Sequence, residues 1–128
     1  MTFDTDVLVW YLRGNERARS FLAGIPFAHR VIPAMVYFEL LQGCRGAQDV
    51  RAVRKFVNRN FSRTLHISEQ ASQRAATLLE RYTASHGLEA GDALIAATVL
   101  VNRQSFATGN VAHYRMIRGL ELVKFSPA

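Results

Sequence analysis

The sequence predicts an α/β protein: a three-layer α/β/α sandwich around a central, mostly parallel sheet, formed by residues 1–128 as one domain. Short apolar segments typical of strands alternate with longer segments typical of helices, and this alternation favours a parallel sheet covered by helices. The length is sufficient for one domain with a substantial core. Hydrophobic residues make up 49% of the chain, which is ordinary for a globular protein.

Glycine and proline separate the elements expected in the first half of the chain. Gly14 and Asn15 end the first helix, and Pro33 fits the first turn of a helix that follows a short buried strand. In "AMVYFELLQG" apolar residues fall on all sides, so we expect this helix to be well buried. The expected elements are a strand at 2–4, helices at 5–13 and 16–25, a strand at 28–33, and helices at 34–43 and 49–60.

Helix-capping residues are clearest in the second half. Ser68 is a good N-cap and Gly87 fits the C′ position, so a helix is expected between them. The segment "GDALIAATVLVN" is apolar all round and rich in alanine, which predicts a helix packed in the core. The expected elements are a strand at 63–67, helices at 68–85 and 91–102, a strand at 104–108, and a helical turn followed by a final strand within 114–125.

The charge balance favours a polyanionic partner. The chain has 16 basic and 10 acidic residues, and all basic residues except Lys55 and Lys124 are arginines. A planar guanidinium group binds phosphate through two parallel hydrogen bonds, so an arginine-rich surface suits a nucleic acid. A GC-rich genome, which favours arginine codons, would produce the same composition.

Neither a signal peptide nor a membrane span is expected. The longest apolar run, residues 93–101, is interrupted by Thr98 and is too short to cross a bilayer. The N-terminus lacks the basic and apolar regions of a signal peptide. Cys44 is the only cysteine, cannot form an internal disulfide, and is expected to be buried. These features predict a cytoplasmic protein with no membrane partner.

Three acidic residues stand in strongly apolar segments, where an unpaired carboxylate is unfavourable. Asp4 closes the first strand, Glu39 lies within "MVYFELLQG", and Asp92 opens "DALIAATVLV". Ligands bind at the carboxyl ends of parallel strands, where Asp4 and the segment 108–110 are expected to meet. A divalent cation is the simplest way to hold several carboxylates together, and a water bound to it can attack a phosphodiester.

Each acidic residue also has an ordinary structural alternative. Asp4 and Asp92 can each cap the helix that follows, and Glu39 can pair with a buried arginine. Asp6 is expected to be structural, accepting hydrogen bonds from nearby backbone N–H groups. The order and context of Asp4, Glu39 and Asp92 together nevertheless favour a metal site.

Four segments resemble, in order, the motifs of PIN-domain ribonucleases: "FDTDVLVWYLRG", "MVYFELLQG", "GDALIAATVL" and "FATGNVAHYRMIRGLEL". Within that group the chain looks like the VapC toxins of bacterial VapBC toxin–antitoxin pairs. The resemblance covers nearly the whole chain, and the pairing of "DTDVL" with "DALIAAT" is its most specific part. It implies a PIN-like fold and a metal-dependent endoribonuclease, the toxin of such a pair, which hydrolyses RNA phosphodiesters with a metal-activated water.

The resemblance also implies a set of site residues. The family's first three acids fall on Asp4, Glu39 and Asp92, which would bind Mg²⁺ or Mn²⁺, with Glu39 either a ligand or the group that orients the attacking water. In the fourth motif, where the family often has one or two aspartates, this chain has Asn110 and His113. Asn110 can still offer a carbonyl oxygen or orient a water, so it is counted with the catalytic residues. His113 would be a softer ligand, better suited to Mn²⁺, unless it is an ordinary core or surface histidine.

The substrate and the partners follow from the same resemblance. Thr5 or Thr108 would hydrogen-bond a carboxylate or a substrate phosphate, and Arg13 and Arg115 are candidates for holding the RNA backbone. A homodimer is expected, together with a cognate VapB-like antitoxin that reaches the acidic pocket with a basic side chain. Apolar residues that would either contact the antitoxin or pack in the core are Trp10, Tyr11, Phe21, Leu22, Tyr37 and Phe38.

Two other functions fit parts of the sequence. Asp-x-Asp before Val-Leu also resembles the first motif of haloacid-dehalogenase-like phosphatases, whose first aspartate is a nucleophile. Those enzymes need a later lysine and an acidic pair, whereas Lys55 falls within a helix, Lys124 is almost terminal, and no acidic pair follows "GDAL". The second alternative is a PIN-fold module that binds RNA or protein but is weakly active or inactive. The neutral Asn110 would then reflect the loss of catalytic activity.

Overall fold

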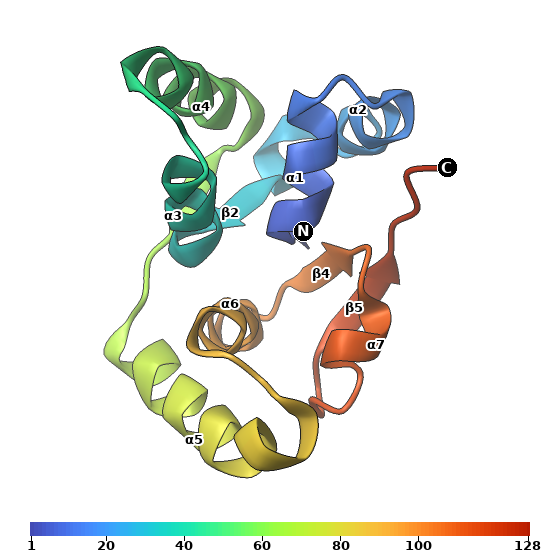
Figure 1. The fold of residues 1–128 in the computed structure, drawn as a ribbon. Coiled ribbons are helices and arrows are strands. Elements are labelled where there is room, and N and C mark those ends of the chain that lie inside the picture. The colour runs from blue at the N-terminus through green and yellow to red at the C-terminus, as the bar shows by residue number, and fades with distance from the viewer.

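Five short parallel strands form the centre of the computed structural model, which describes residues 1–128 (Figure 1). Strands β1, β4 and β5 form one sheet in that order, and β2 pairs with β3. The main-chain N–H of Val31 donates to the carbonyl of Met1 at 3.1 Å, which places β2 beside β1. The strands are β1 (Thr2–Phe3), β2 (Val31–Pro33), β3 (Arg63–Leu65), β4 (Ser105–Thr108) and β5 (Glu121–Lys124).

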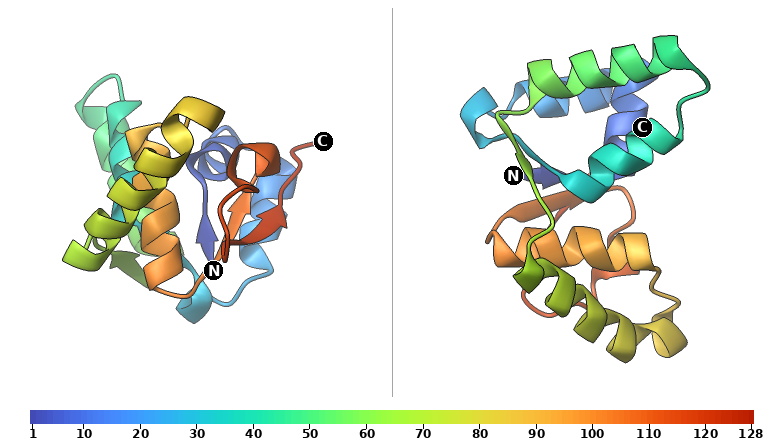
Figure 2. Two further views of the ribbon diagram at one scale, coloured as in Figure 1. Left: turned by 90° about the horizontal axis from the view of Figure 1, so that it is seen from below. Right: turned by 90° about the vertical axis from the view of Figure 1, so that its left-hand side faces the viewer.

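Helices cover both sides of these strands, which confirms the predicted α/β class with parallel strands. Figures 1 and 2 show α1, α2 and α4 on one side and α5 and α6 on the other. Helix α3 packs against both groups, because it contacts α1 and α4 as well as α6. The helices are α1 (Thr5–Leu12), α2 (Glu16–Ala23), α3 (Ala34–Gln42), α4 (Ala47–Asn60), α5 (Glu69–His86), α6 (Ala90–Val101) and α7 (Val111–Tyr114), with a 3₁₀ turn at Phe27–His29.

Two helices of the second half form for the local reasons that the sequence indicated. The Ser68 hydroxyl accepts a hydrogen bond from the Ala71 N–H and begins α5, and Gly87 ends it in the left-handed conformation, at φ +66°. Helix α6 is the core helix, with Ile95 and Val99 fully buried. Strand β4 follows α6 in the chain and contacts α1, and just after β4 the Gly109 N–H donates to Asp6 of α1.

Helix α3 differs from the prediction. It was expected to be buried on all sides, but the structure buries only Ala34, Val36 and Leu40, and Phe38 is 50% exposed. Helix α3 contacts α1, α4 and α6, but none of these helices covers the part of its surface that carries Phe38. Cys44, expected to be buried, is half-buried, and its thiol lies 3.4 Å from the Leu40 carbonyl.

The remaining differences lie at element ends. Asp4 is the N-cap of α1 rather than the last residue of β1, and Pro33 ends β2 and is the N-cap of α3 rather than part of its first turn. Helix α4 begins two residues earlier than expected, and α7 begins at Val111 rather than Tyr114. Strand β3 ends at Leu65, before His66 and Ile67. None of the helices combines the length and apolar character needed to span a bilayer.

Candidate active site

The carboxyl ends of β1 and β4 bring distant acidic residues together. The parallel register pairs Phe3 with Ala107, so Asp4, which follows β1, lies beside Thr108 at the end of β4. Glu39 comes from α3 and Asp92 from the first turn of α6. The four elements that supply the site are therefore β1, β4, α3 and α6, which converge near the centre of Figure 1.

Asp4 is the most buried acid, with 9% of its surface exposed. One carboxylate oxygen accepts the Thr5 N–H at 2.9 Å, and the other accepts the Thr108 hydroxyl at 2.8 Å. Burial raises its pKa to about 6, the two hydrogen bonds oppose that rise, and the negative charges of Asp6 and Glu39 add to it. The expected helix-cap alternative is thus confirmed, but the cap does not compensate for the burial of the charge.

Glu39 approaches both Asp4 and Asp92. Its Oε1 accepts the Thr5 hydroxyl at 2.5 Å, and Thr5 directly follows Asp4. A methyl group built on Gly91 would lie 3.2 Å from Glu39 Oε2, which places this carboxylate against the turn that carries Asp92. No arginine pairs with Glu39, because the only ion pair in the structure joins His113 and Asp92. The arginine-pair alternative is therefore wrong.

Both oxygens of Asp92 are held by the residues of α7. His113 Nε2 lies 2.9 Å from Oδ2, and the Tyr114 hydroxyl donates to Oδ1 at 3.2 Å. Asp92 Oδ2 also accepts the Glu89 N–H at 3.4 Å, but the N-cap of α6 is Glu89 and Asp92 lies in the first turn, so the expectation that Asp92 itself is the N-cap is wrong. His113 is thus neither an ordinary core histidine nor an isolated surface one, since it faces a site carboxylate.

Tyr114 is a site residue that the sequence analysis did not predict. Its side chain is 1% exposed, and its ring stands edge-on to Phe106 at 5.1 Å between centroids. Burial raises its pKa, and so do the negative charges of Asp4, Asp92 and Glu39, so the hydroxyl stays protonated and remains a donor to Asp92. The only sequence signal was its place directly after His113, which does not by itself indicate a contact with α6.

Asp6 has the structural role expected for it. Its Oδ2 accepts the Gly109 N–H at 3.0 Å, while its Oδ1 is buried without a hydrogen-bond partner. Burial raises its pKa, and the nearby backbone N–H groups of Val7 and Gly109 oppose the rise. A methyl group on Gly109 would lie only 2.6 Å from Asp6 Oδ2, so this contact requires glycine. Asp6 thereby ties the loop that carries Asn110 to α1.

The other expected site residues are less closely joined to the acids. Asn110 is exposed; its backbone N–H donates to the Thr108 hydroxyl at 3.0 Å, and no hydrogen bond joins its side-chain amide to the three acids. Arg13 is exposed at the end of α1. Arg115 is exposed just after α7, and no ion pair or side-chain hydrogen bond connects it to the site.

The residues fit a hard divalent cation. Asp4, Glu39 and Asp92 all lie near the Tyr114 hydroxyl, and neither lysine nor arginine neutralises them. Carboxylate oxygens are the ligands that Mg²⁺ and Mn²⁺ prefer. As the side chains stand, no three His, Cys, Asp or Glu residues form a finished ligand set, so the carboxylates must rotate toward one another when they bind an ion.

A groove of about 430 Å³ runs from this site between α1, α3 and α4. Glu39 and Asp49 are its acidic lining residues, and Arg13 is its basic one. The rest of the lining is mostly apolar, with Val9, Leu12 and Val53 among it. A polymer that reaches the acids can therefore continue along the protein surface.

Comparison with known proteins shows to which family this chain belongs. Residues 1–118 match the family model described as the PIN domain. The chain belongs to the PIN-domain family. It is 34% identical over 123 residues to Ribonuclease VapC10 and to Ribonuclease VapC19, both from Mycobacterium tuberculosis. The match covers 92% of this chain in both cases, with 88% of VapC10 and 94% of VapC19.

Solved structures show the same fold. A toxin–antitoxin complex from Klebsiella pneumoniae matches with a TM-score of 0.78 and 24% identity over 99% of this chain and 97% of that one. VapBC2 from Rickettsia felis, bound to a DNA fragment from its promoter, matches with a TM-score of 0.82 and 15% identity over 98% of both chains. The PIN-like fold expected from the sequence is confirmed, and the haloacid-dehalogenase alternative is wrong.

Proposed function

We propose that this chain is a VapC-type ribonuclease, the toxin of a toxin–antitoxin pair, and that it hydrolyses RNA phosphodiesters with Mg²⁺ or Mn²⁺. Its curated relatives are ribonucleases of this type over nearly the whole chain. One observation supports the chemistry most strongly: Asp4, Glu39 and Asp92 converge from three distant elements without a cationic side chain to neutralise them. Such a cluster favours a bound divalent cation.

Asp4 and Asp92 would hold the ion, and Glu39 would complete the set or orient the attacking water. When bound, the ion supplies an activated water and offsets the charge that develops on the phosphate. Thr5 and Thr108 hold Glu39 and Asp4 through their hydroxyls, while His113 and Tyr114 hold Asp92. These contacts hold the carboxylates close to the site before they turn toward the ion, and hydrogen-bonded partners of ligands commonly tune metal affinity.

Substrate and partners complete the proposal. Asn110 stands exposed beside Thr108, where its amide can contact a water or a phosphate oxygen. A VapB-like antitoxin would cover the groove beside Glu39 and reach the carboxylates with a basic side chain, because several solved structures of this fold are toxin–antitoxin complexes. The protein would act as a homodimer in the cytoplasm, where its RNA substrate is found. Light scattering of the purified chain tests the dimer.

Cleavage of total RNA by antitoxin-free protein tests the activity. We expect products with Mg²⁺ or Mn²⁺, none with EDTA, and none from Asp4→Asn or Asp92→Asn. Glu80→Gln, an exposed residue of α5, is the matched control and should cleave as the wild type does. Cleavage that survives EDTA and both site substitutions would contradict the metal mechanism.

A binding module with little or no turnover is the second candidate function. The observation that favours it is the neutral Asn110, which stands where the resemblance to PIN-domain ribonucleases implies an acid and forms no side-chain hydrogen bond to the three acids. Mn²⁺ binding without cleavage of any RNA would support this candidate. Asn110→Asp should then increase cleavage, because it adds a carboxylate to the site.

A further inference from the structure

His113 stands beside a site carboxylate, unlike the other histidines of the chain. Its Nε2 lies 2.9 Å from Asp92 Oδ2, and its side chain is 30% exposed. None of the other three lies within ion-pair distance of a carboxylate, and all of them are exposed: His29, His66 and His86. His113 therefore places an imidazole nitrogen at the edge of the acidic site and leaves the ring open to solvent.

Helix α7 keeps this ring next to Asp92. The following residue, Tyr114, is buried, packs edge-on against Phe106 and donates its hydroxyl to Asp92 Oδ1 at 3.2 Å. The backbone N–H of His113 donates to the Asn110 carbonyl at 3.1 Å, which closes the short helix. Because its neighbour in the chain is anchored in this way, the imidazole can turn about its own side-chain bonds but stays within reach of any ion that Asp92 binds.

The spacing of the two groups suits two ligands of one ion. Adjacent ligands of an octahedral ion, each about 2.1 Å from it, lie about 3.0 Å apart. His113 Nε2 and Asp92 Oδ2 are 2.9 Å apart, so one ion can bind both after a small movement. A ligating Nε2 uses its lone pair, which requires the ring proton on Nδ1. No protein group forms a hydrogen bond with Nδ1, so that position is free to carry the proton.

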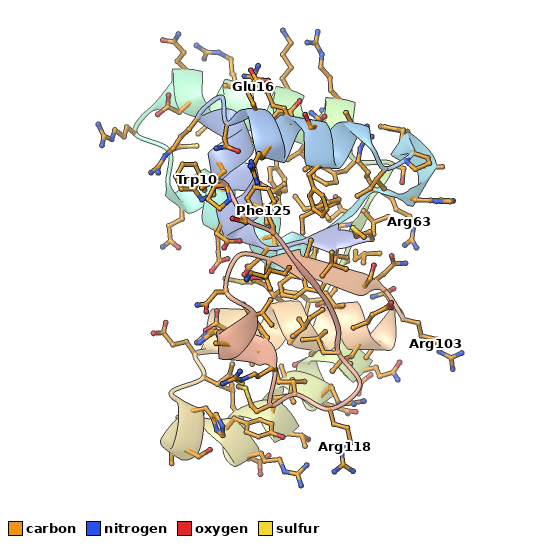
Figure 3. The ribbon with its side chains drawn as sticks, turned by 90° about the vertical axis from the view of Figure 1, so that its right-hand side faces the viewer. Trp10, Glu16, Arg63, Arg103, Arg118 and Phe125 are labelled. Carbon is orange, nitrogen blue, oxygen red and sulfur yellow. The ribbon has the colours of Figure 1, made fainter.

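No cationic side chain takes this place beside Asp92. Arg115, two residues after His113, is exposed and forms no ion pair. Figure 3 shows Arg103 and Arg118, which precede β4 and follow α7, extending outward from the molecule. An arginine facing Asp92 would compete with a metal ion for the carboxylate, whereas a neutral imidazole adds a ligand to the same ion.

We propose that His113 is a nitrogen ligand of the bound ion and that it makes the site prefer Mn²⁺ and Co²⁺ to Mg²⁺. This inference rests on the proposed metal-dependent function and deepens it, because it selects among the ions that the carboxylates alone would accept. Mg²⁺ takes oxygen ligands almost exclusively, whereas imidazole suits transition metals. The affinity of a site with a nitrogen ligand rises from Mn²⁺ to Co²⁺, so Co²⁺ should bind most tightly of the three.

Pulsed electron paramagnetic resonance of the Mn²⁺-loaded protein tests the ligand directly. The full-length chain is used without a histidine tag, and a nitrogen bound to Mn²⁺ modulates the electron spin echo. We expect this modulation in the wild type, a changed pattern when the histidines carry ¹⁵N, and no modulation in His113→Gln. The glutamine amide can still donate to Asp92 but offers no nitrogen lone pair. His66→Gln, an exposed residue just after β3, is the matched control and should keep the modulation.

Calorimetric titration with Mg²⁺, Mn²⁺ and Co²⁺ measures the preference. His113→Gln should weaken Co²⁺ binding about tenfold or more and change Mg²⁺ binding much less. His113→Asp supplies oxygen in place of nitrogen, so the ratio of Co²⁺ to Mg²⁺ affinity should fall about tenfold or more. If His113 only positions Asp92 through a hydrogen bond, His113→Gln will keep the wild-type affinity ratios. Urea unfolding in EDTA shows whether each variant is folded before it is titrated.

The possible failures are distinguishable. Mn²⁺ binding without nitrogen modulation, or with unchanged affinity ratios in His113→Gln, would refute the ligand role of His113 and leave the site of three carboxylates intact. Modulation that persists in His113→Gln would assign the nitrogen to another histidine and would also refute the proposal. A folded wild type that binds none of the three ions would refute the proposed metal-dependent function itself.

Discussion

Asp4→Asn should stabilise the metal-free protein at neutral pH. Asp4 is 9% exposed and its pKa is raised by burial from 3.8 to about 6. Between these two values the folded protein retains a proton that the unfolded chain has released, so the free energy of unfolding falls as pH rises through this window. Above about pH 6 the folded protein carries the full free-energy cost of the buried Asp4 charge, and below pH 3.8 it carries none of it.

The size of the effect follows from the same shift. A displacement of about two pH units corresponds to about 3 kcal/mol. An asparagine still accepts the Thr5 N–H, but its amide group replaces the oxygen that accepts the Thr108 hydroxyl. Losing that hydrogen bond removes about 1 kcal/mol. The variant should therefore be more stable than the wild type by about 2 kcal/mol at pH 7.5, and by much less at pH 4.5.

Urea unfolding in EDTA at these two pH values measures the difference, with Glu80→Gln as the control for removing an exposed carboxylate. Saturating Mn²⁺ should reverse the order, because it stabilises only the protein that binds it. The explanation is contradicted if Asp4→Asn is no more stable than the wild type at pH 7.5, or if its advantage does not shrink at pH 4.5. In either case the buried charge of Asp4 does not destabilise the metal-free protein.

Two further substitutions test contacts around the site, and a third tests a helix cap away from it. Gly109→Ala should lower stability by about 1–3 kcal/mol and weaken Mn²⁺ binding, because its methyl group would meet Asp6 Oδ2 at 2.6 Å. An unchanged melting temperature and an unchanged Mn²⁺ affinity would contradict this prediction. Tyr114→Phe removes one donor to Asp92 and should lower stability by about 1 kcal/mol and weaken Mn²⁺ binding several-fold, as read by urea unfolding and calorimetry. Ser68→Ala should lower stability by about 1 kcal/mol through the lost cap but leave Mn²⁺ binding unchanged, so a change in affinity would argue against a purely local role.

Elements defined by local chemistry could be predicted from the sequence. Ser68 and Gly87 begin and end α5 as expected, because a hydroxyl cap and a left-handed glycine act within a few residues. The acids Asp4, Glu39 and Asp92 stood out because a carboxylate in an apolar segment requires compensation. The proximity of Asp4 to Thr108 followed from a general property of parallel sheets, whose carboxyl ends meet at one edge. Glu39 and Asp92 lie on helices, and only the resemblance to PIN-domain ribonucleases grouped them with Asp4.

The contacts that the sequence did not reveal depend on tertiary placement. Whether Phe38 is buried depends on which part of the α3 surface its neighbouring helices cover, and apolar residues on all sides of a helix do not indicate that part. The hydrogen bond from Tyr114 to Asp92 depends on where α7 lies against α6, and the contact of Asp6 with Gly109 depends on the packing of α1 against β4. Residues far apart in the chain make each of these contacts, so no local pattern predicts them.

Calorimetric titration of Mn²⁺ into the metal-free protein tests the central claim most directly, because it needs neither the RNA target nor the antitoxin. If the three carboxylates form one cation site, the wild type binds Mn²⁺, and Asp4→Asn, Glu39→Gln and Asp92→Asn each weaken binding at least tenfold, while Glu80→Gln does not. Binding that is equally strong in all four variants, or absent from a folded wild type, would contradict the account.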